Sequence, residues 1–501
     1  GGMKRDAPTL TPAITDWSRK APAAPAILTA AGTLSFAELD RAINWTADSF
    51  MRAGLASGNR VGLQLANQIQ QLISSLALAR LGAGQIAFNL SDGPQFRGDL
   101  IRRLSLAAII TDQASTNGSG APAVGPPPDP LSDLKSLPTM TFDPAVGGDL
   151  PYIIAPTSGT SAGRPKLGMI NQQLGKLRGR ASGHLLPDGP GCIFLALGDV
   201  AFQSMKRRAL AILYSGGCVA LRTGTENTSQ LIDFIAEGGI NYLSGTAVHA
   251  SALLQEAPAG PVLLPGLNAI RMSSTLIADN LREEILDRLT PKLFVTYGLT
   301  EFGTVAVATP GQVAAIAGVV GTLVPGAEAA IVDDRGQQLP AGEPGHLRVK
   351  SDTLVGGYLG APLASEEAFH DGWFDTGDLV TMTSEGCLIH HGRADDVMIL
   401  DGINIHPAEI ESALLRHPAV AETAAFSVQA DIRGDLPMVA VVLKEKTSAK
   451  LLIKFGRAEL GSRRPRGVMI LDALPRNAAG KVLRNQLIAE YQRRHGENLD
   501  Q

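Results

Sequence analysis

The sequence predicts an α/β protein with a large layered α/β N-terminal domain and a smaller α+β C-terminal domain. Two observations lead to this prediction. An alternating strand at 61–65, a buried helix at 68–81 and a short strand at 85–89 follow one another, and this order is typical of a sheet covered by helices. The chain has 501 residues, of which 45% are hydrophobic, so it is long enough to bury a large core.

Local signals justify the first elements. Ser35 and Glu38 have the spacing of a capping box, and apolar residues then recur near the helical period until Gly54, so we expect a helix over 36–53. Gly82 is expected to end the second helix. The other expected elements are strands at 107–111 and 152–155, joined by a surface connection over 114–149 that is rich in Ser, Gly and Pro.

A second change in composition marks the C-terminal part. Turns rich in Gly and Asp around 371–404 give way to a helix that begins near Pro407. Residues 396–501 are enough for a small separate domain.

Charge and cysteine content exclude several classes of protein. The 44 Lys and Arg residues against 48 Asp and Glu give a net charge of −4, so there is no global case for nucleic acid or an anionic membrane as the main partner. Cys192, Cys218 and Cys387 lie far apart, which favours a reduced, cytoplasmic protein without a disulfide framework or zinc site.

No apolar run reaches the roughly 20 residues of a membrane span. No GxGxxG motif opens a helix, which disfavours a nicotinamide-dependent dehydrogenase.

The segment 157–166 is a phosphate-binding loop by composition. It follows a predicted strand, and its N–H groups, hydroxyls and lysine could surround phosphate oxygens. It is not a Walker loop, because Arg164 and Pro165 stand before the lysine and Leu167 follows it. Taken alone, a flexible loop is an equally good interpretation. The candidate phosphate-binding residues are Thr157, Ser158, Gly159, Thr160, Ser161, Gly163 and Lys166.

Four further strings follow this segment. They are TYGLTE at 296–301, GWFDTGD at 372–378, GRADD at 392–396 and PRNAAGKVLR at 475–484. Together with the loop, their order and spacing resemble the adenylate-forming superfamily of acyl- and aryl-CoA synthetases, nonribosomal adenylation domains and luciferases. The resemblance covers about residues 30–490. One such string is weak evidence, whereas five in sequence are strong.

The resemblance implies roles for individual residues in the attack of a carboxylate on the α-phosphate of ATP. Because two anions meet in this reaction, cations and hydrogen-bond donors are needed. The loop 157–166 would hold the β- and γ-phosphates. The other implied roles are Thr300 at the α-phosphate, Glu301 and Thr160 at Mg²⁺, Tyr297 against adenine, Asp378 at the ribose hydroxyls, Arg393 near ribose and phosphate, and Lys481 bridging carboxylate and phosphate.

Thioester formation is implied by the same resemblance. In this family a small C-terminal domain rotates between the two half-reactions, and Asp395 occupies the hinge position. We therefore expect a large AMP-binding domain of residues 3–394 and a small domain of residues 395–501. Gly402 would let the pantetheine arm pass close to the backbone, although a plain turn also explains a glycine here. The run 402–411 looks more like CoA ligases than amino-acid-activating domains.

The acid-binding pocket is the part of the site for which the sequence gives the weakest prediction. Asp199 could pair with an amino or hydroxyl group of the substrate, but a helix-capping aspartate is the commoner case. The run Lys206, Arg207 and Arg208 could receive a second substrate carboxylate, although adjacent cations on a helix point in different directions and are more often solvated. By resemblance, the expected pocket residues are Asp199, Phe202, Ser273, Ser274, Thr275 and Gly298.

We therefore expect an ATP- and Mg²⁺-dependent ligase that activates a small or medium carboxylic acid as an acyl-adenylate and transfers the acyl group to CoA. One alternative is an adenylating ligase that loads a carrier-protein phosphopantetheine. Another is a non-catalytic paralogue that binds acyl-AMP or nucleotide. The retained Glu301 and Lys481 argue against the paralogue, whereas Ile399 and His346 depart from the family pattern and keep it open.

Overall fold

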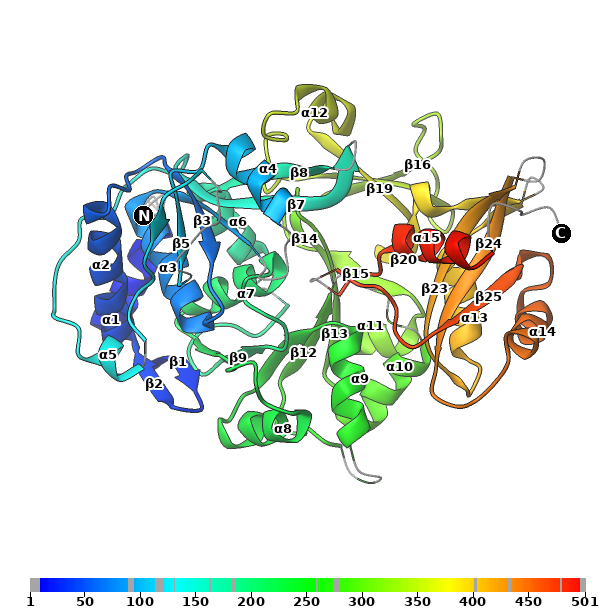
Figure 1. Ribbon diagram of the computed structural model, residues 1–501, viewed down its shortest axis with the longest axis horizontal. Helices are drawn as coiled ribbons and strands as arrows, with labels where there is room; N and C mark the ends of the chain where they lie inside the picture. Colours follow the sequence, from blue (N-terminus) through cyan, green and yellow to red (C-terminus); the bar gives the residue numbers. More distant parts are fainter. Residues whose placement is uncertain are drawn as a thin grey trace.

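The computed structural model describes residues 10–88, 94–112, 120–129, 131–161, 164–182, 185–257, 260, 262–273, 277, 279–400, 403–430, 434–477 and 480–495. Within these ranges the strands form three sheets with helices packed around them (Figure 1). The elements of the N-terminal part (blue) and of the C-terminal part (orange and red) lie at opposite ends of this view. The observed class is α/β, as the sequence predicts.

The first sheet contains the strand–helix–strand unit expected from the sequence. Its strands are β3 (Arg60–Gln64), β4 (Gly84–Ala87), β5 (Ala108–Thr111), β6 (Ala123–Val124), β7 (Pro151–Ser161) and β8 (Arg164–Asn171). They lie in the order β6-β5-β3-β4-β7-β8. Neighbours are parallel except β7 and β8, which form an antiparallel hairpin.

The second sheet is the largest and carries most of the residues of the candidate site. Its strands are β1 (Pro25–Thr29), β2 (Gly32–Ser35), β9 (Ile193–Ala196), β10 (Cys218–Ala220), β11 (Tyr242–Gly245), β12 (Ala269–Ser273), β13 (Leu293–Leu299), β14 (Gly303–Ala308), β15 (Val319–Leu323), β16 (Glu328–Val332), β17 (Pro344–Lys350), β18 (Phe369–His370), β19 (Trp373–Met382) and β20 (Cys387–Arg393). The path from β1 through β10, β9, β11 and β12 to β13 is parallel, and pairing from β13 to β14 onward is antiparallel. Strand pairing in this sheet therefore changes from parallel to antiparallel at β13, where the string at 296–301 begins.

Helices flank both of these sheets. They are α1 (Pro12–Lys20), α2 (Phe36–Arg52), α3 (Gln68–Leu81), α4 (Pro94–Leu104), α5 (Leu131–Lys135), α6 (Gln172–Ser182), α7 (Gln203–Tyr214), α8 (Thr228–Glu237), α9 (Ala247–Glu256), α10 (Asp279–Glu284), the π-helix η1 (Ile285–Leu289), α11 (Pro310–Ala315) and α12 (Pro362–Ala368). The contacts of α6 with β14 and with α7 matter for the site, because they join helices of the N-terminal part to the antiparallel region of the large sheet.

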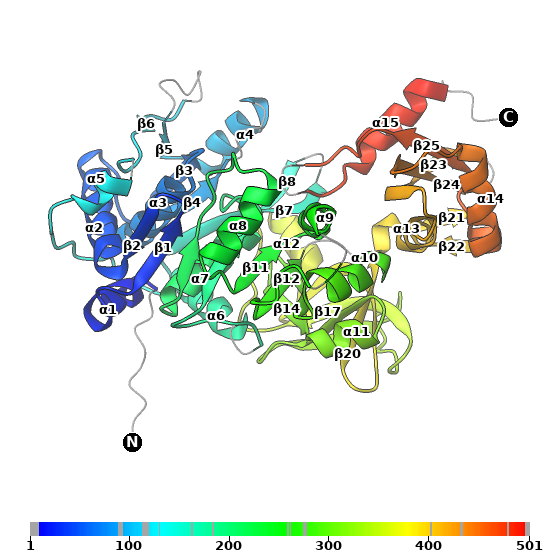
Figure 2. The same cartoon turned by 90° about the horizontal axis from the view of Figure 1, so that it is seen from below.

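The C-terminal part forms the third sheet with its own helices. Its elements are the 3-10 helix η2 (Ala394–Asp396), β21 (Met398–Leu400), β22 (Ile403–Ile405), α13 (Pro407–Leu415), β23 (Val420–Ala430), β24 (Gly434–Leu443), α14 (Ala449–Leu460), the 3-10 helix η3 (Gly461–Arg463), β25 (Gly467–Leu471) and α15 (Arg484–His495). Figure 2 shows α13 and α14 at the opposite end of the molecule from α1 and α2. The helix expected to begin near Pro407 is α13.

Several local predictions are confirmed. The helix α2 runs to Arg52, and both hydrogen bonds of the Ser35–Glu38 capping box are present. The helix α3 has the predicted bounds and ends at Gly82, whose φ of 77° is in the left-handed region that glycine adopts without strain. Capping chemistry is local, and this explains why the sequence predicts these boundaries well.

Two local predictions need correction. The segment 114–149 is not wholly a surface connection, because its described residues include β6 and α5, and Leu131 and Leu134 of α5 are buried. The segment 157–166 is not a free loop. The strand β7 continues to Ser161 and β8 begins at Arg164, so the described residues form a β-hairpin. Backbone pairing across β7 and β8 stabilises this hairpin, although its Gly and Ser content favours a loop.

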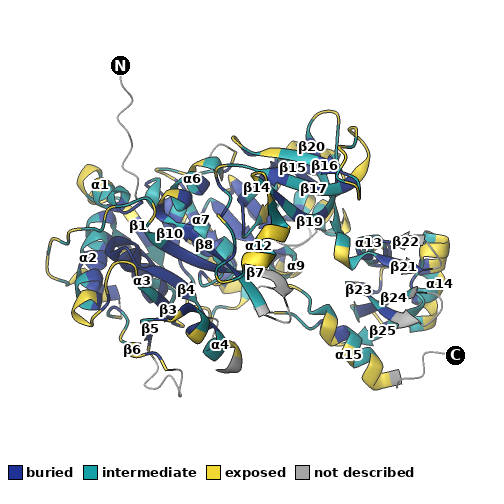
Figure 3. Cartoon of the chain, turned by 90° about the horizontal axis from the view of Figure 1, so that it is seen from above, coloured by how far each residue is buried: buried dark blue, intermediate teal, exposed yellow. Residues whose placement is uncertain are grey.

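Strands inside the molecule are made largely of buried residues (dark blue), whereas α12 and α14 carry exposed residues (yellow) on the outside (Figure 3). Separate clusters of buried side chains lie in the C-terminal part, around α13 and beside α15. Cys192, Cys218 and Cys387 are buried free thiols. In the part of the chain that the structure describes, no helix combines the length and apolar character of a transmembrane helix.

Candidate active site

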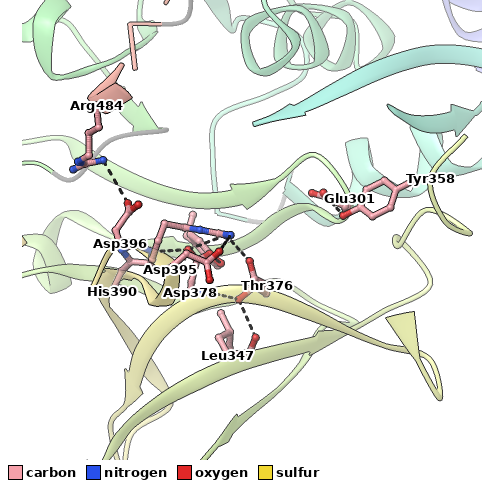
Figure 4. Close-up of polar contacts among 11 residues, drawn as sticks. Glu301, Leu347, Tyr358, Thr376, Asp378, His390, Asp395, Asp396 and Arg484 are labelled. Atoms are coloured by element: carbon pink, nitrogen blue, oxygen red, sulfur yellow. Dashed lines mark hydrogen bonds and ion pairs between the residues drawn. The ribbon is translucent and has the colours of Figure 1, made fainter. Parts of the chain in front are cut away.

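Tyr297, Asp378 and Arg393 meet although they come from three strands. Tyr297 lies on β13 and Asp378 on β19, and the register of β19 with β20 places Arg393 opposite Asp378. The Tyr297 hydroxyl donates a hydrogen bond to Oδ2 of Asp378. At the other carboxylate oxygen, Oδ1, Nη1 of Arg393 lies at 3.5 Å and Nε2 of His390 at 3.4 Å (Figure 4). The structure therefore brings three predicted site residues together and adds His390.

Asp378 is a buried carboxylate, with a relative exposure of 4%. Burial acts to raise its pKa, but His390, the hydrogen bond from Tyr297 and the charge of Arg393 together outweigh burial and lower the pKa of Asp378. Burial, and then the charge of Asp378, raise the pKa of Tyr297. The carboxylate is thus held as an ionised acceptor beside an aromatic ring.

Thr376 fixes the backbone around this carboxylate. Its hydroxyl donates to the carbonyl of Leu347 at 2.8 Å and accepts from the N–H of Asp378 at 3.0 Å. Its own carbonyl accepts from Nη1 of Arg393 at 2.6 Å. These contacts hold the backbone of Asp378 and the guanidinium of Arg393 against Thr376, and Figure 4 shows Thr376 beside Asp378 and Leu347. A carboxylate and a guanidinium placed in this way suit hydroxyl groups and phosphate oxygens, respectively.

Glu301 forms a second centre in the turn between β13 and β14. Its side chain is buried, and Oε1 accepts a hydrogen bond of 2.8 Å from the hydroxyl of Tyr358 (Figure 4). The Nζ atom of Lys166 lies 5.0 Å from the ring centroid of Tyr358, in cation–π contact. Tyr358 therefore connects a lysine of the β7–β8 hairpin to a carboxylate of the β13–β14 turn.

Arg178 of α6 holds the turn that carries Thr300 and Glu301. Its guanidinium donates to the carbonyl of Thr300 at 3.1 Å and to the carbonyl of Glu301 at 2.6 Å. It also donates twice to the carbonyl of Thr353, at 3.0 and 2.8 Å. Burial, and then the charge of Arg207, lower the pKa of Arg178, whereas Glu301 opposes this. Arg178 could not be predicted from the sequence, because its role depends on backbone carbonyls more than 120 residues away.

Lys481 lies on the turn that precedes α15. Its side chain is exposed, and its backbone N–H donates a hydrogen bond of 2.9 Å to Oδ1 of Asn477. Partial shielding from water is the main cause of its lowered pKa; the charges of Arg393 and Arg484 add to this, whereas Asp396 and Asp378 oppose it. Lys481 is thus within electrostatic reach of the Asp378 and Arg393 centre.

The predicted hinge residue Asp395 belongs to η2, between β20 and β21. Its side chain is exposed, and its Oδ2 lies 3.6 Å from Nη2 of Arg393. The next residue, Asp396, faces Nη1 of Arg484 at 3.5 Å, and Nη2 of Arg484 contacts Glu411 at 3.0 Å. Figure 4 shows Asp395 and Asp396 side by side with Arg484 above them.

The structure describes some of the other predicted residues fully, some only in their backbone and some not at all. Thr157 is buried near the middle of β7, and Lys166 lies on β8. Ser158, Gly159, Thr160 and Ser161 belong to β7, and their side chains lie outside the description. Gly163, Ser274, Thr275 and Gly402 lie outside the described residues. Among the residues that the structure does describe, no group of three or more His, Cys, Asp or Glu side chains is arranged to hold a metal ion.

A cavity of about 410 Å³ is lined by Arg178, which holds the Thr300–Glu301 turn, and by Thr304 of β14. The helices α1, α6 and α7 and the strands β12 and β14 contribute to its wall, which includes Arg178, Arg207, Arg271 and Thr304. Asp199, Phe202, Ser273 and Gly298, which were expected at the acid pocket, are not among the residues that line this cavity.

Near α7, Asp199 accepts a hydrogen bond of 2.7 Å from the N–H of Ala201, so it caps the turn before the helix. The interpretation of Lys206, Arg207 and Arg208 as solvated cations is wrong. Lys206 and Arg208 are buried, and Arg207 lines the cavity. The sequence gives no direct signal that both faces of α7 are covered.

The layered sheets, the small C-terminal unit and the clustered tyrosine, aspartate and arginine define an adenylate-forming protein. The chain belongs to the AMP-binding enzyme family, whose sequence pattern matches residues 14–359. The pattern of the AMP-binding enzyme C-terminal domain matches residues 409–481.

Curated relatives are named as CoA ligases. The chain is 29% identical to a long-chain-fatty-acid–CoA ligase of Escherichia coli over 61% of its length and 55% of the relative. It is 26% identical to 2-succinylbenzoate–CoA ligase of Bacillus licheniformis over 91% of this chain and 94% of the relative. It is 26% identical to feruloyl-CoA synthase of Amycolatopsis over 94% and 96%. With the E. coli relative and with 2-succinylbenzoate–CoA ligase of Bacillus velezensis, the alignments span about half of the relative's length.

Solved structures share the fold. ATP-bound MatB from Rhodopseudomonas palustris superposes with a TM-score of 0.86 at 24% identity, covering 97% of this chain and 99% of MatB. The apo form of the same protein gives a TM-score of 0.75. The o-succinylbenzoate CoA synthetase of Bacillus subtilis with ATP and magnesium gives 0.85 at 24% identity, covering 95% and 98%.

Proposed function

We propose that this protein activates a small or medium carboxylic acid with ATP as an acyl-adenylate and then transfers the acyl group to the thiol of CoA. The observation that supports this most directly is the meeting of Tyr297, Asp378 and Arg393 within electrostatic reach of Lys481. These groups come from both the large sheet and the C-terminal part. The names of the relatives support CoA as the acceptor.

In the first half-reaction, a substrate carboxylate oxygen forms a bond to the α-phosphorus of ATP, and the bond to the β-phosphate oxygen breaks to release pyrophosphate. Asp378 would accept hydrogen bonds from the ribose hydroxyls, and Tyr297 would lie against the adenine. Arg393 and Lys481 would neutralise the charge that builds up where the two anions meet. Thr300 would donate to the α-phosphate, and the hairpin residues from Thr157 to Lys166 would hold the outer phosphates.

The residues present fit a magnesium ion bound with the nucleotide. The buried Glu301 carboxylate accepts from Tyr358 through Oε1, so Oε2 would be the oxygen offered to a hard cation, and Thr160 would be a second protein ligand. One or two protein oxygens are sufficient, because Mg²⁺ completes its coordination with phosphate oxygens and water. When bound, the ion would supply charge neutralisation at the phosphates.

In the second half-reaction, the CoA sulfur attacks the acyl carbon, AMP leaves and the thiol proton is lost. We propose that residues 395–501 form a domain that turns about Asp395, relative to residues 3–394, to replace Lys481 with the thiol. The exposed Asp395 side chain and the short η2 helix suit a hinge, because few packing contacts would have to break. Gly402 would lie beside the pantetheine arm.

The test is pyrophosphate release with ATP and Mg²⁺ over a panel of carboxylic acids, with and without CoA, followed by mass spectrometry of the products. We expect pyrophosphate with at least one acid and the matching acyl-CoA when CoA is present. Adenylate without any CoA product would instead support loading of a carrier-protein phosphopantetheine. Nucleotide binding without turnover of any acid would contradict the proposal and favour a non-catalytic binder.

A further inference from the structure

Five arginines line the cavity described above, and three of them are linked to one another electrostatically. Arg178 comes from α6, Arg207 from α7 and Arg271 from β12, and all three line the wall. After burial, the charge of Arg207 lowers the pKa of Arg178, and the charge of Arg271 lowers the pKa of Arg207. Like charges at a sheltered site repel, so such a cluster needs anionic or strongly polar acceptors.

The protein supplies acceptors for two of the three. Arg178 donates to backbone carbonyls of the Thr300–Glu301 turn. The Nε of Arg271 donates to the hydroxyl of Thr296 at 3.0 Å, and its Nη1 donates to the hydroxyl of Ser244 at 3.2 Å. These acceptors are neutral, so they satisfy hydrogen bonds without cancelling the positive charge.

Arg207 differs from the other two. Among the described residues it has no hydrogen-bond or ion-pair partner, and burial, with the charge of Arg271, lowers the pKa of Arg207 to about 10. Its position on α7 sets it between Ser204 and Ala211, which line the same cavity at helical spacing. A cationic group is thus presented to the cavity by one face of α7.

Acidic residues of the wall do not balance this charge. Asp16 and Asp188 line the cavity, but neither is among the groups that shift the pKa of Arg207 or Arg271. Glu301 acts on Arg178, but its carboxylate already accepts from Tyr358. The cavity wall, with five arginines and Lys176 against Asp16 and Asp188, therefore carries excess positive charge.

The cavity is linked to the proposed reaction centre through Thr304 and Arg178. Thr304 lines the cavity, and the register of β13 with β14 pairs it with Gly298. Arg178 both lines the cavity and holds the carbonyls of Thr300 and Glu301. A molecule in the cavity would therefore be separated from the proposed adenylation site by a single turn of the chain.

We propose that this cavity holds the acid and that the acid is a dicarboxylic acid, whose second carboxylate is bound by Arg207 and Arg271. This inference rests on the proposed function. A planar guanidinium group pairs with a carboxylate through two parallel hydrogen bonds, which gives both charge and geometric selectivity. The other carboxylate would be the one that is adenylated.

The kinetic test compares straight-chain and benzene dicarboxylic acids with their monomethyl esters, which keep the size but remove one charge. With the wild-type protein we expect kcat/KM for pyrophosphate release to be at least about tenfold higher for the best diacid than for its half-ester. Arg207→Met keeps the aliphatic stem and should lower the diacid value by about tenfold to a hundredfold, while the half-ester value changes little. Arg60→Met, a half-buried arginine outside the cavity whose Nη1 donates to the carbonyl of Leu104, is the matched control and should leave both values unchanged.

Three results would overturn the inference while the proposed function stands. The first is an equal wild-type kcat/KM for the diacid and its half-ester, and the second is pyrophosphate release with monoacids but not with diacids. The third is an equal loss of kcat/KM for both substrates in Arg207→Met. Should Arg207→Met not fold, Arg207→Lys keeps the charge without the two-pronged geometry and should show a smaller loss for the diacid alone. If no acid releases pyrophosphate, the proposed function fails. Calorimetric binding of the same diacids and half-esters without ATP still decides the inference, since binding without preference for the diacid contradicts it.

Discussion

The hydroxyl of Tyr358 donates a 2.8 Å hydrogen bond to Oε1 of Glu301, although the two residues are 57 positions apart in the sequence. Both side chains are buried, so the hydrogen bond is shielded from water. Burial, and then the charge of Glu301, raise the pKa of Tyr358, so the phenol stays protonated and keeps donating. The buried carboxylate is therefore fixed in one orientation before any ligand arrives.

Tyr358→Phe should weaken the use of Mg²⁺ and ATP. The substitution removes the hydrogen bond to Glu301 but keeps the aromatic ring that faces Lys166. A hydrogen bond to a charged group contributes roughly 1.5–3 kcal/mol, so the KM for Mg-ATP should rise about tenfold or more. Pyrophosphate release at varied Mg-ATP measures this. Tyr491→Phe, in α15, is the control and should leave KM unchanged.

Asp378→Asn should raise the KM for ATP while the fold is retained. The amide has the shape of the carboxylate but lacks its charge, so the contacts with Tyr297 and Arg393 weaken and the acceptor for hydroxyl groups is poorer. We expect an increase of about tenfold, measured by ATP–pyrophosphate exchange. Asp375→Asn is the matched control, because Asp375 lies on the same strand and pairs with Arg348. Equal effects of the two substitutions would contradict a nucleotide-binding role for Asp378.

Arg178→Lys should lower the rate of adenylation more than it lowers stability. Lysine keeps the charge but cannot donate at once to the carbonyls of Thr300, Glu301 and Thr353. Freed carbonyls would let the turn move, so kcat should fall about tenfold or more. Steady-state kinetics and the melting temperature measured together check this. A melting temperature that falls with no change in kcat would assign Arg178 to stability alone.

Lys481→Ala should separate the two half-reactions. Adenylation should fall by about a hundredfold or more, because the cation that would neutralise the meeting anions is lost. Thioester formation from a supplied acyl-adenylate should stay largely intact. Because the pKa of Lys481 is lowered, its charge is lost at lower pH than for a solvated lysine, so wild-type adenylation should decline as pH rises through this pKa. Equal loss of both half-reactions in Lys481→Ala would contradict the assigned role.

Lys206→Met should raise the melting temperature most at neutral pH. Burial lowers the pKa of Lys206 to about 7, against 10.5 for an ordinary lysine, and Nζ has one hydrogen bond of 3.3 Å, to Gln85. Between these two pH values the unfolded chain holds a proton that the folded chain lacks, so wild-type stability should rise by about 1.4 kcal/mol per pH unit. The advantage of the variant should therefore shrink between pH 7 and pH 9.5.

Scanning calorimetry at the two pH values measures this effect. Lys450→Met, at an exposed position on α14, is the control, and its melting temperature should differ from wild type by the same amount at both. A constant advantage of Lys206→Met at both pH values would show that the amine does not titrate in this range.

The parts of the fold that local chemistry determines could be predicted from the sequence. The capping box at Ser35 and the glycine at the end of α3 define helix boundaries within one residue. The β7–β8 hairpin could not be predicted, because its Ser and Gly residues favour a loop and only pairing between the two strands makes them extended.

The same distinction holds at the candidate site. Tyr297, Asp378, Arg393 and Lys481 stand in recognisable strings, so they could be named before the structure placed the first three together. Arg178 and Tyr358 have no such string, and the run 206–208 does not show which of its cations face the cavity. The contacts of Arg178 and Tyr358 join segments far apart in the chain, and pairing of this kind leaves no local signal.

The position of Arg178 has a thermodynamic consequence. Its guanidinium touches both the cavity and the turn that carries Thr300 and Glu301, so the proposed acid site and the proposed nucleotide site share one side chain. An acid that reorients this group changes the affinity for ATP by a certain factor, and ATP must then change the affinity for the acid by the same factor. The two substrates would be coupled before any bond forms, and that coupling is reciprocal whichever binds first.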